Sequence, residues 1–157
     1  MSTNAEIARI AEEIRSAFDG EAWHGPSLME VLEDVNAIMA ASRPIAGAHT
    51  IWELTLHIQA WEEVIRRRLG GQALTLSDAE NFPNVSDNSE RAWKNALQEL
   101  KSTHDALLAT VRGMSDDRLE ETVPGKHYNV YTMLHGATQH AIYHGGQIVI
   151  LKRALGS

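Results

Sequence analysis

The sequence predicts an all-α protein in which four substantial helices, with short additional helices, form a bundle. Apolar residues recur at spacings of three and four along almost the whole chain, which is typical of helices with one buried face. No segment of useful length alternates between apolar and polar residues, so no sheet is expected. Glycine and proline interrupt the apolar pattern at a few places and separate the expected helices.

Two apolar stripes indicate helices in the N-terminal third of the chain. The first stripe ends at Gly20, and the second, shorter stripe follows a break at residues 23–26. Both have the spacing of one helix face. The first consists of Ile7, Ile10, Ala11, Ile14 and Phe18, and the second of Leu28, Val31, Leu32, Val35 and Ile38.

A third helix is expected from Thr50 to Leu69. Thr50 and Glu53 have the spacing of a capping box, in which the threonine side chain accepts from the Glu53 backbone N–H and the glutamate reaches back. Gly70 and Gly71 end the pattern. The apolar face of this helix carries Leu54, Ile58, Trp61, Ile65 and Leu69.

Two long helices are expected in the C-terminal half. One begins between Ser86 and Ser89 and ends at Gly113, and the other covers residues 129–155. Residues 115–128, between them, are expected to hold a short helical turn. The apolar faces consist of Trp93, Leu97, Leu100, His104, Leu107 and Val111 in one helix, and of Leu134, Ala137, Ala141, His144, Ile148, Leu151 and Leu155 in the other.

Composition excludes several classes of function. The 157 residues show no domain boundary or repeat, so residues 1–157 are expected to form one domain. The absence of cysteine excludes disulfides, thiolate metal sites and cysteine nucleophiles. A net charge of −7 is not typical of a protein that binds nucleic acid. No signal peptide or membrane-spanning segment is visible, so a cytoplasmic protein without membrane contact is expected.

The pair His140 and His144 is the clearest candidate for chemistry. Residues four apart in a helix share a face, so both imidazoles are expected on one side of the last helix. His144 interrupts an apolar stripe and is therefore expected to point into the bundle, where a polar group needs a partner. The spacing suits two ligands of one metal ion. For such a pair alone, two hydrogen-bonded core histidines are the more common explanation.

A third histidine favours a metal site. His57 lies beside the apolar face of the third helix, so it is expected at the interior or its margin. Three imidazoles from two helices leave coordination positions open, which is typical of catalytic rather than structural metal sites. Because the chain has no thiolate ligands, zinc, nickel, iron or manganese suits it better than copper(I).

Three further residues are candidates for supporting the site or lining a pocket. Gln147 shares a helix face with His144 and can bond a metal-bound water, a substrate or another helix. Glu53 precedes His57 by one turn and can orient it, although a capping role is at least as well supported. Tyr143 can line the pocket, but packing within the bundle is favoured.

The remaining polar residues are weaker candidates. His104 is expected to be a hydrogen-bonded core histidine rather than a fourth ligand. Arg68 closes a short basic run, which is typical of a solvated helix end, although it lies near the face of His57 and could meet an anionic substrate. Gly145 and Gly146 suggest close approach by another helix. The other histidines, expected outside the site, are His24, His49, His127 and His135.

Two segments together resemble the motifs of the DinB/YfiT-like superfamily. Segment 131–151 contains Leu-His-Gly followed by His-x-x-Tyr-His-x-Gly-Gln-Ile. Segment 48–70 contains a histidine in a helix with a following tryptophan, and residues 23–28 also fit the N-terminal part of the family. The resemblance therefore spans nearly the whole chain.

The resemblance implies the four-helix bundle of that family and a divalent metal ion bound by His57, His140 and His144. It implies nickel or zinc as the metal, with iron or manganese as alternatives, and a homodimer. Relatives include thiol-dependent S-transferases, a mycothiol-dependent maleylpyruvate isomerase and proteins described as metal-dependent hydrolases.

The leading hypothesis is a metal-dependent enzyme that acts on a small molecule, as a thiol-dependent S-transferase or a hydrolase. Because the chain has no cysteine, the thiol would be a low-molecular-weight cofactor. The alternative is a non-catalytic stress-response protein that binds a metal or a small ligand. A third interpretation is a structural bundle whose core histidines bind no metal.

Overall fold

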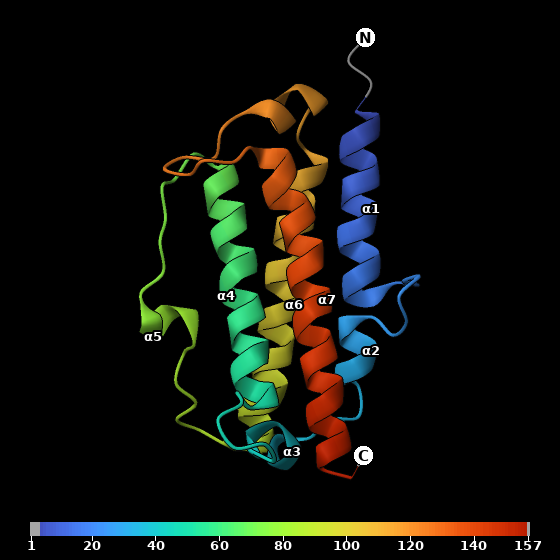
Figure 1. Cartoon of the computed structure of the whole chain (residues 1–157), viewed down its shortest axis with the longest axis vertical. Coiled ribbons are helices and arrows are strands. Elements are labelled where there is room, and N and C mark those ends of the chain that lie inside the picture. Colours follow the sequence, from blue (N-terminus) through green and yellow to red (C-terminus); the bar gives the residue numbers. More distant parts are fainter. Residues whose placement is uncertain (1–3, 157) are drawn as a thin grey trace.

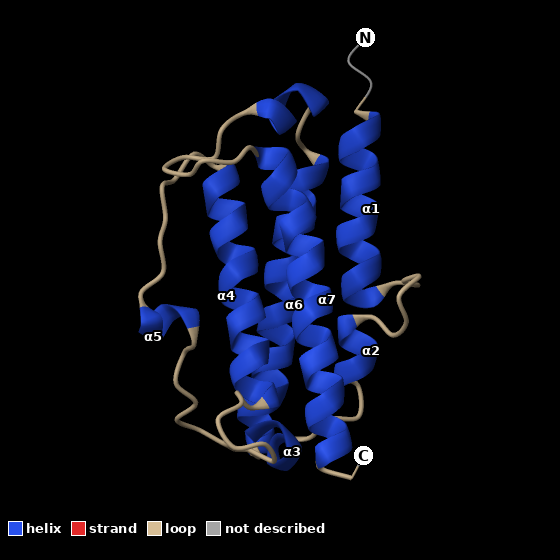
Figure 2. Ribbon diagram, viewed as in Figure 1, coloured by secondary structure: helices blue, strands red, loops and turns tan. Residues whose placement is uncertain are grey.

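Four long helices lie side by side along the longest axis of the molecule (Figure 1). The computed structural model describes residues 4–156. The regular elements in this range are all helical, which confirms the all-α prediction (Figure 2). The long helices are α1 (Ala5–Asp19), α4 (Ile51–Leu69), α6 (Glu90–Arg112) and α7 (Val130–Ala154).

Short helices occupy the connections between the long ones. They are α2 (Leu28–Leu32), α3 (Ala37–Ala41), α5 (Asp78–Asn81) and the 3-10 helix η1 (Asp116–Glu120). The connection that carries α5 runs along the outside of α4 (Figure 1).

The single stripe expected from Leu28 to Ile38 is in fact two helices, α2 and α3. Asn36 lies outside both, and its side chain accepts a hydrogen bond from the Met39 backbone N–H at 2.9 Å. This cap starts a new helix rather than continuing the first. Ile38 is 80% exposed, so its expected place on the buried face is wrong.

The expected ends of α4 are confirmed. Thr50 Oγ1 accepts from the Glu53 backbone N–H at 3.1 Å, and Glu53 Oε2 accepts from the Thr50 N–H at 2.9 Å. Gly70 follows the last helical residue. These local bonds satisfy backbone donors that the first turn of a helix leaves without partners. They fix where α4 starts and therefore the position of each α4 side chain along the axis of the bundle.

Helix α4 packs against both α6 and α7. It runs antiparallel to α7 (Figure 1), and the two helices pack directly against each other. The apolar core forms two clusters, one around Phe18, Trp52 and Trp93 and the other around Ile7, Leu107 and Leu134. No helix of the described residues is long and apolar enough to span a membrane.

A buried hydrogen bond joins α6 to the connection between α2 and α3. Trp93 Nε1–H donates to the Val35 carbonyl at 2.7 Å, and the Trp93 side chain is 1% exposed. Trp93→Phe would leave this carbonyl without its partner. We therefore expect the free energy of unfolding to fall by ~1–3 kcal/mol, measured by urea denaturation.

Trp23→Phe is the matched control, because the Trp23 side chain is fully exposed. It should change the free energy of unfolding by no more than ~0.5 kcal/mol. Equal effects of the two substitutions would contradict a stabilising role for the Trp93 hydrogen bond.

Candidate metal centre

Three histidines meet in the groove between α4 and α7. His140 Nε2 lies 3.0 Å from His57 Nε2 and 3.1 Å from His144 Nε2. One ligand atom from each residue lies within 4.8 Å of the others. Nitrogen ligands of one tetrahedral zinc ion lie roughly 3.3 Å apart. The spacing of the three nitrogens is therefore close to that of a single metal site.

The Nδ1 atoms of His57 and His144 are hydrogen-bonded to carbonyl oxygens, which fixes the orientation of both rings. His57 Nδ1–H donates to the Asn81 carbonyl at 2.7 Å, and His144 Nδ1–H donates to Gln147 Oε1 at 2.6 Å. A carbonyl oxygen only accepts, so the proton of each neutral ring lies on Nδ1. The Nε2 atoms of both rings therefore present lone pairs toward the centre, as in metal-bound histidines.

The third ring cannot satisfy both of these lone pairs. His140 Nε2 carries at most one proton, so it can donate to only one of its two neighbours, His57 or His144. A cation where the three nitrogens converge would satisfy all of their lone pairs. These residues therefore fit a divalent metal ion.

Burial is the main cause that lowers the pKa of all three histidines. Burial, together with the charges of His144 and His57, lowers the pKa of His140 to about 3. The hydrogen bonds to Asn81 and Gln147 raise the pKa of the other two rings only in part. The rings are thus neutral near pH 7, and their lone pairs are free to bind a metal without losing protons.

Residues at the end of α5 cover the histidine cluster from outside α4. The Phe82 ring stacks on His57 at a centroid distance of 4.2 Å and on His49 at 3.7 Å. The side chain of Asn81, whose carbonyl binds His57, accepts from Trp61 Nε1–H at 2.8 Å. This segment therefore orients one ligand ring and shields it from water.

Neither Asn81 nor Phe82 was singled out from the sequence. The signal that could have found them is Ser77-x-x-Glu80, a second capping box. Glu80 Oε2 accepts from the Ser77 N–H at 2.9 Å, and the serine hydroxyl accepts from the Glu80 N–H at 3.3 Å. This capping box begins α5 and therefore positions Asn81 and Phe82, the two residues that follow Glu80.

The family model described as the DinB superfamily matches residues 22–148. This range contains all three histidines of the cluster and most of the chain. The chain belongs to the DinB superfamily. Comparisons with curated proteins and with solved structures gave no match.

In this DinB protein, Glu53 does not contact His57. Its carboxylate instead accepts from the Thr50 N–H, from Arg43 at 2.6 Å and from His49 at 3.1 Å. The capping interpretation therefore holds, and the alternative in which the Glu53 carboxylate orients His57 is wrong. The reason is that the first turn of α4 leaves a backbone donor beside Glu53, closer than the ring one turn later.

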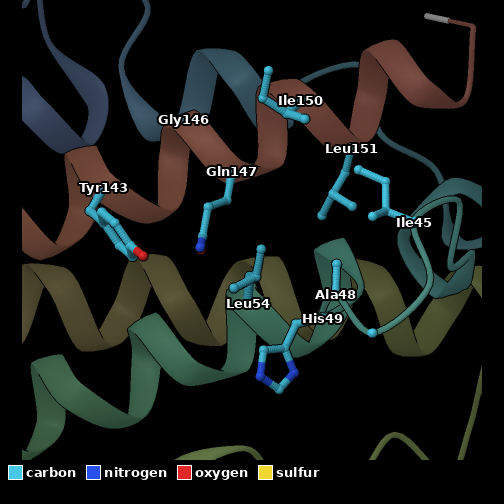
Figure 3. A pocket seen from close by; sticks show the side chains of 10 residues that line it. Ile45, Ala48, His49, Leu54, Tyr143, Gly146, Gln147, Ile150 and Leu151 are labelled. Atoms are coloured by element: carbon cyan, nitrogen blue, oxygen red, sulfur yellow. The ribbon is translucent and has the colours of Figure 1, made fainter.

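Gln147 and Tyr143 both lie beside the cluster. Gln147 bonds His144 within α7, rather than another helix, and its side chain extends from α7 toward α4 (Figure 3). Tyr143, for which packing was favoured, is 65% exposed and lines the same cavity as Gln147. A residue next to His144 in the helix points about 100° away from it, which turns Tyr143 out of the core.

Two other histidines have partners away from the cluster. His104 is buried as expected, with Nδ1 3.0 Å from Glu62 Oε1 and its ring stacked on Phe18. Burial raises the pKa of the Glu62 carboxyl. His135 forms an ion pair with Glu13 at 3.3 Å. Neither histidine joins the candidate metal centre.

The close helix approach expected at Gly145 and Gly146 is wrong. A Cβ atom added to either residue would have no neighbouring atom within 4 Å apart from the adjacent chain. Gly146 lines a cavity with Tyr143 and Gln147. The absence of its side chain therefore keeps the groove open.

The groove contains one cavity on each side of the histidine cluster. The first has a volume of about 520 Å³, and its lining includes His49, Leu54, Tyr143, Gly146 and Gln147 (Figure 3). The second has a volume of about 210 Å³, and its lining includes Trp61, Arg68, Tyr128 and His140. Along α4, His57 lies between the residues that line the first cavity and those that line the second, and His140 lines the second cavity itself.

Gln147→Leu removes the acceptor that fixes the His144 ring. We expect the dissociation constant for Zn²⁺ to rise about 10–100-fold, because partners of ligand histidines contribute that much to metal affinity. Competition titration of untagged protein measures this constant. Gln139→Leu, an exposed glutamine on the same helix, should bind Zn²⁺ like the wild type. An unchanged constant in Gln147→Leu would argue against the orienting role.

The depressed pKa of His140 predicts acid sensitivity of the metal-free protein. Below its ordinary value of 6.5 the unfolded chain binds a proton that the folded state excludes down to about pH 3. The free energy of unfolding should therefore fall as the pH decreases from 7 toward 5. Urea denaturation in chelator should show a weaker pH dependence for His140→Gln. The same pH dependence in both proteins would contradict the prediction.

Proposed function

We propose that this DinB protein is a metal-dependent enzyme that acts on a small molecule. The observation that carries the proposal is the convergence of three Nε2 atoms, from His57, His140 and His144, between two cavities. A divalent ion held by three imidazoles has open positions, where it lowers the pKa of a bound water or thiol.

We propose nickel or zinc as the bound metal, with iron or manganese as alternatives. Imidazole nitrogen is a good ligand for each of these ions. The side chains that converge here offer only nitrogen, because the chain contains no cysteine. The hydrogen bonds to Asn81 and Gln147 hold two of the ligands in place before an ion arrives.

Thiol transfer is favoured over hydrolysis by two features of the groove. The two cavities offer separate places for a low-molecular-weight thiol and an electrophile. The hydrogen bonds that the described residues make to the three histidines involve no carboxylate that could act as a general base. A thiol loses its proton more easily than water does, so it depends less on such a base. The thiol would release its proton to solvent, its sulfur would bond to an electrophilic carbon, and the bond from that carbon to the leaving group would break with both electrons going to the leaving group.

The missing general base also favours a second candidate, a protein that binds a metal or a small ligand without catalysis. That candidate predicts stoichiometric metal and saturable ligand binding but no turnover. A homodimeric state and a cytoplasmic location stay predictions from the sequence, as does a small molecule rather than nucleic acid as the partner.

Elemental analysis of untagged protein tests the metal site. We expect near-stoichiometric nickel, zinc, iron or manganese in the wild type and loss of that metal in His144→Ala. His135→Ala is the matched control, because His135 lies on the same helix outside the cluster. If the wild type contains no metal and added ions leave its melting temperature unchanged, the proposed site is wrong.

A substrate panel run with and without an added thiol tests the reaction. Turnover of chlorodinitrobenzene-type electrophiles only in the presence of thiol supports S-transfer. Turnover of esters or amides without thiol would instead identify a hydrolase. If the metal-loaded protein turns over neither class, the non-catalytic alternative is favoured.

A further inference from the structure

Arg68, in the last turn of α4, is a buried cation without an anionic partner. Its side chain is 4% exposed, although a basic run at a helix end was expected to be solvated. Nη1–H donates to Tyr128 Oη at 3.0 Å, Nη2–H donates to the Leu74 carbonyl at 2.6 Å, and Nε has no partner. None of the ion pairs among the described residues involves Arg68. Buried guanidinium groups are normally paired, because removing the charge from water costs free energy.

Two neighbours stabilise this charge without neutralising it. The Arg68 Cζ atom lies 5.5 Å from the centroid of the Trp61 ring, within the range of a cation–π interaction. The C-terminal end of α4 also favours a cation. Neither offers an acceptor to Nε–H, and a guanidinium has five N–H donors in all. Arg68 therefore keeps donor capacity that the protein itself does not use.

Arg68 is also part of the wall of the smaller cavity. This cavity, called here the Arg68 cavity, is otherwise lined largely by apolar and aromatic side chains. They include Trp61, Ile65, Tyr128, Thr132, Met133 and His140. One charged group in a mostly apolar cavity is typical of a site for a small ligand with an apolar body and one group of opposite charge.

The same cavity reaches the histidine cluster. His140 is part of its wall, and the Trp61 ring lies 6.1 Å from the His140 ring, centroid to centroid. Trp61 thus neighbours both the guanidinium and the cluster. A molecule bound through an anionic group at Arg68 would extend along Trp61 and present its other end to the three histidines.

We propose that the Arg68 cavity is the substrate subsite and takes a small organic anion, such as a carboxylate on an apolar or aromatic body. The proposal rests on the proposed function, since it assigns the substrate class of that site. The guanidinium would bind the anion through paired N–H donors. Tyr128 accepts from Nη1–H and can donate its own O–H to the same anion.

The test measures binding of benzoate, with benzamide as a neutral molecule of nearly the same shape. Both are titrated into metal-free wild-type protein and followed by the ¹H–¹⁵N resonances of the Arg68 Nε–H and the Trp61 indole. We expect saturable shifts with benzoate and an affinity for benzamide lower by about tenfold or more. Benzenesulfonate and phenyl phosphate show which anion the subsite prefers, and preference for any of the three anions over benzamide supports the proposal.

Two variants separate anion binding from a purely structural role of Arg68. Arg68→Lys keeps the charge but loses the forked donors, so benzoate affinity should fall about tenfold. Tyr128→Phe removes one hydroxyl and should weaken benzoate several-fold. Arg67→Lys is the matched control, because Arg67 is exposed and bonds Gln72 outside the cavity. It should bind benzoate like the wild type.

Equal affinity of the wild type for benzamide and all three anions would overturn the proposal, whether or not the variants fold. Unchanged benzoate affinity in a folded Arg68→Lys protein would also overturn the proposal. Arg68 would then have only a structural role, in which its hydrogen bonds link α4 to neighbouring segments. Because the titration uses metal-free protein, the measured preference for anions does not depend on whether the protein is a metal enzyme. Anion binding without metal in the elemental analysis would refute the metal enzyme alone, and metal without anion preference would refute the subsite alone.

Discussion

Polar side chains that are buried along α4 need partners in the protein, and the connection that follows this helix supplies two of them. His57 donates to the Asn81 carbonyl, and Arg68 donates to the Leu74 carbonyl. Both acceptors belong to the connection that runs along the outside of α4 (Figure 1). The path of that connection is therefore tied to the same side chains that make the groove chemically active.

The groove between α4 and α7 combines two electrostatic environments. At its centre, burial keeps the three histidines neutral, so they act as lone-pair donors. In the smaller cavity, Arg68 supplies a fixed positive charge against an apolar wall. The proposed cation site and the proposed anion site thus lie close together but use different atoms. Under the proposed function, this separation would allow a substrate to be held by its charge while its other end meets the metal site.

Most of the helices, and the residues of the histidine cluster, follow from local patterns in the sequence. Helical periodicity and the capping box place α4, and the four-residue spacing places His140 and His144 on one face. Their meeting with His57 depends on how α4 packs against α7; the family resemblance implied the three ligands but not this packing. The break between α2 and α3 was missed because Asn36 caps locally inside an apolar stripe. The burial of Arg68 was missed because the residues that cover it come from distant parts of the chain.

The placement of α5 has a consequence for how fast an ion could enter or leave. Its residues are not buried in the core, and Phe82 packs over the cluster by ring stacking on His49 and His57. A segment with few buried contacts opens at a much lower free energy than the whole bundle. Exchange of an ion would therefore need only this segment to lift away, with α4 and α7 still packed. The lifetime of a bound ion would then depend on the mobility of the segment, while its affinity would depend on the three rings and on the hydrogen bonds that orient them.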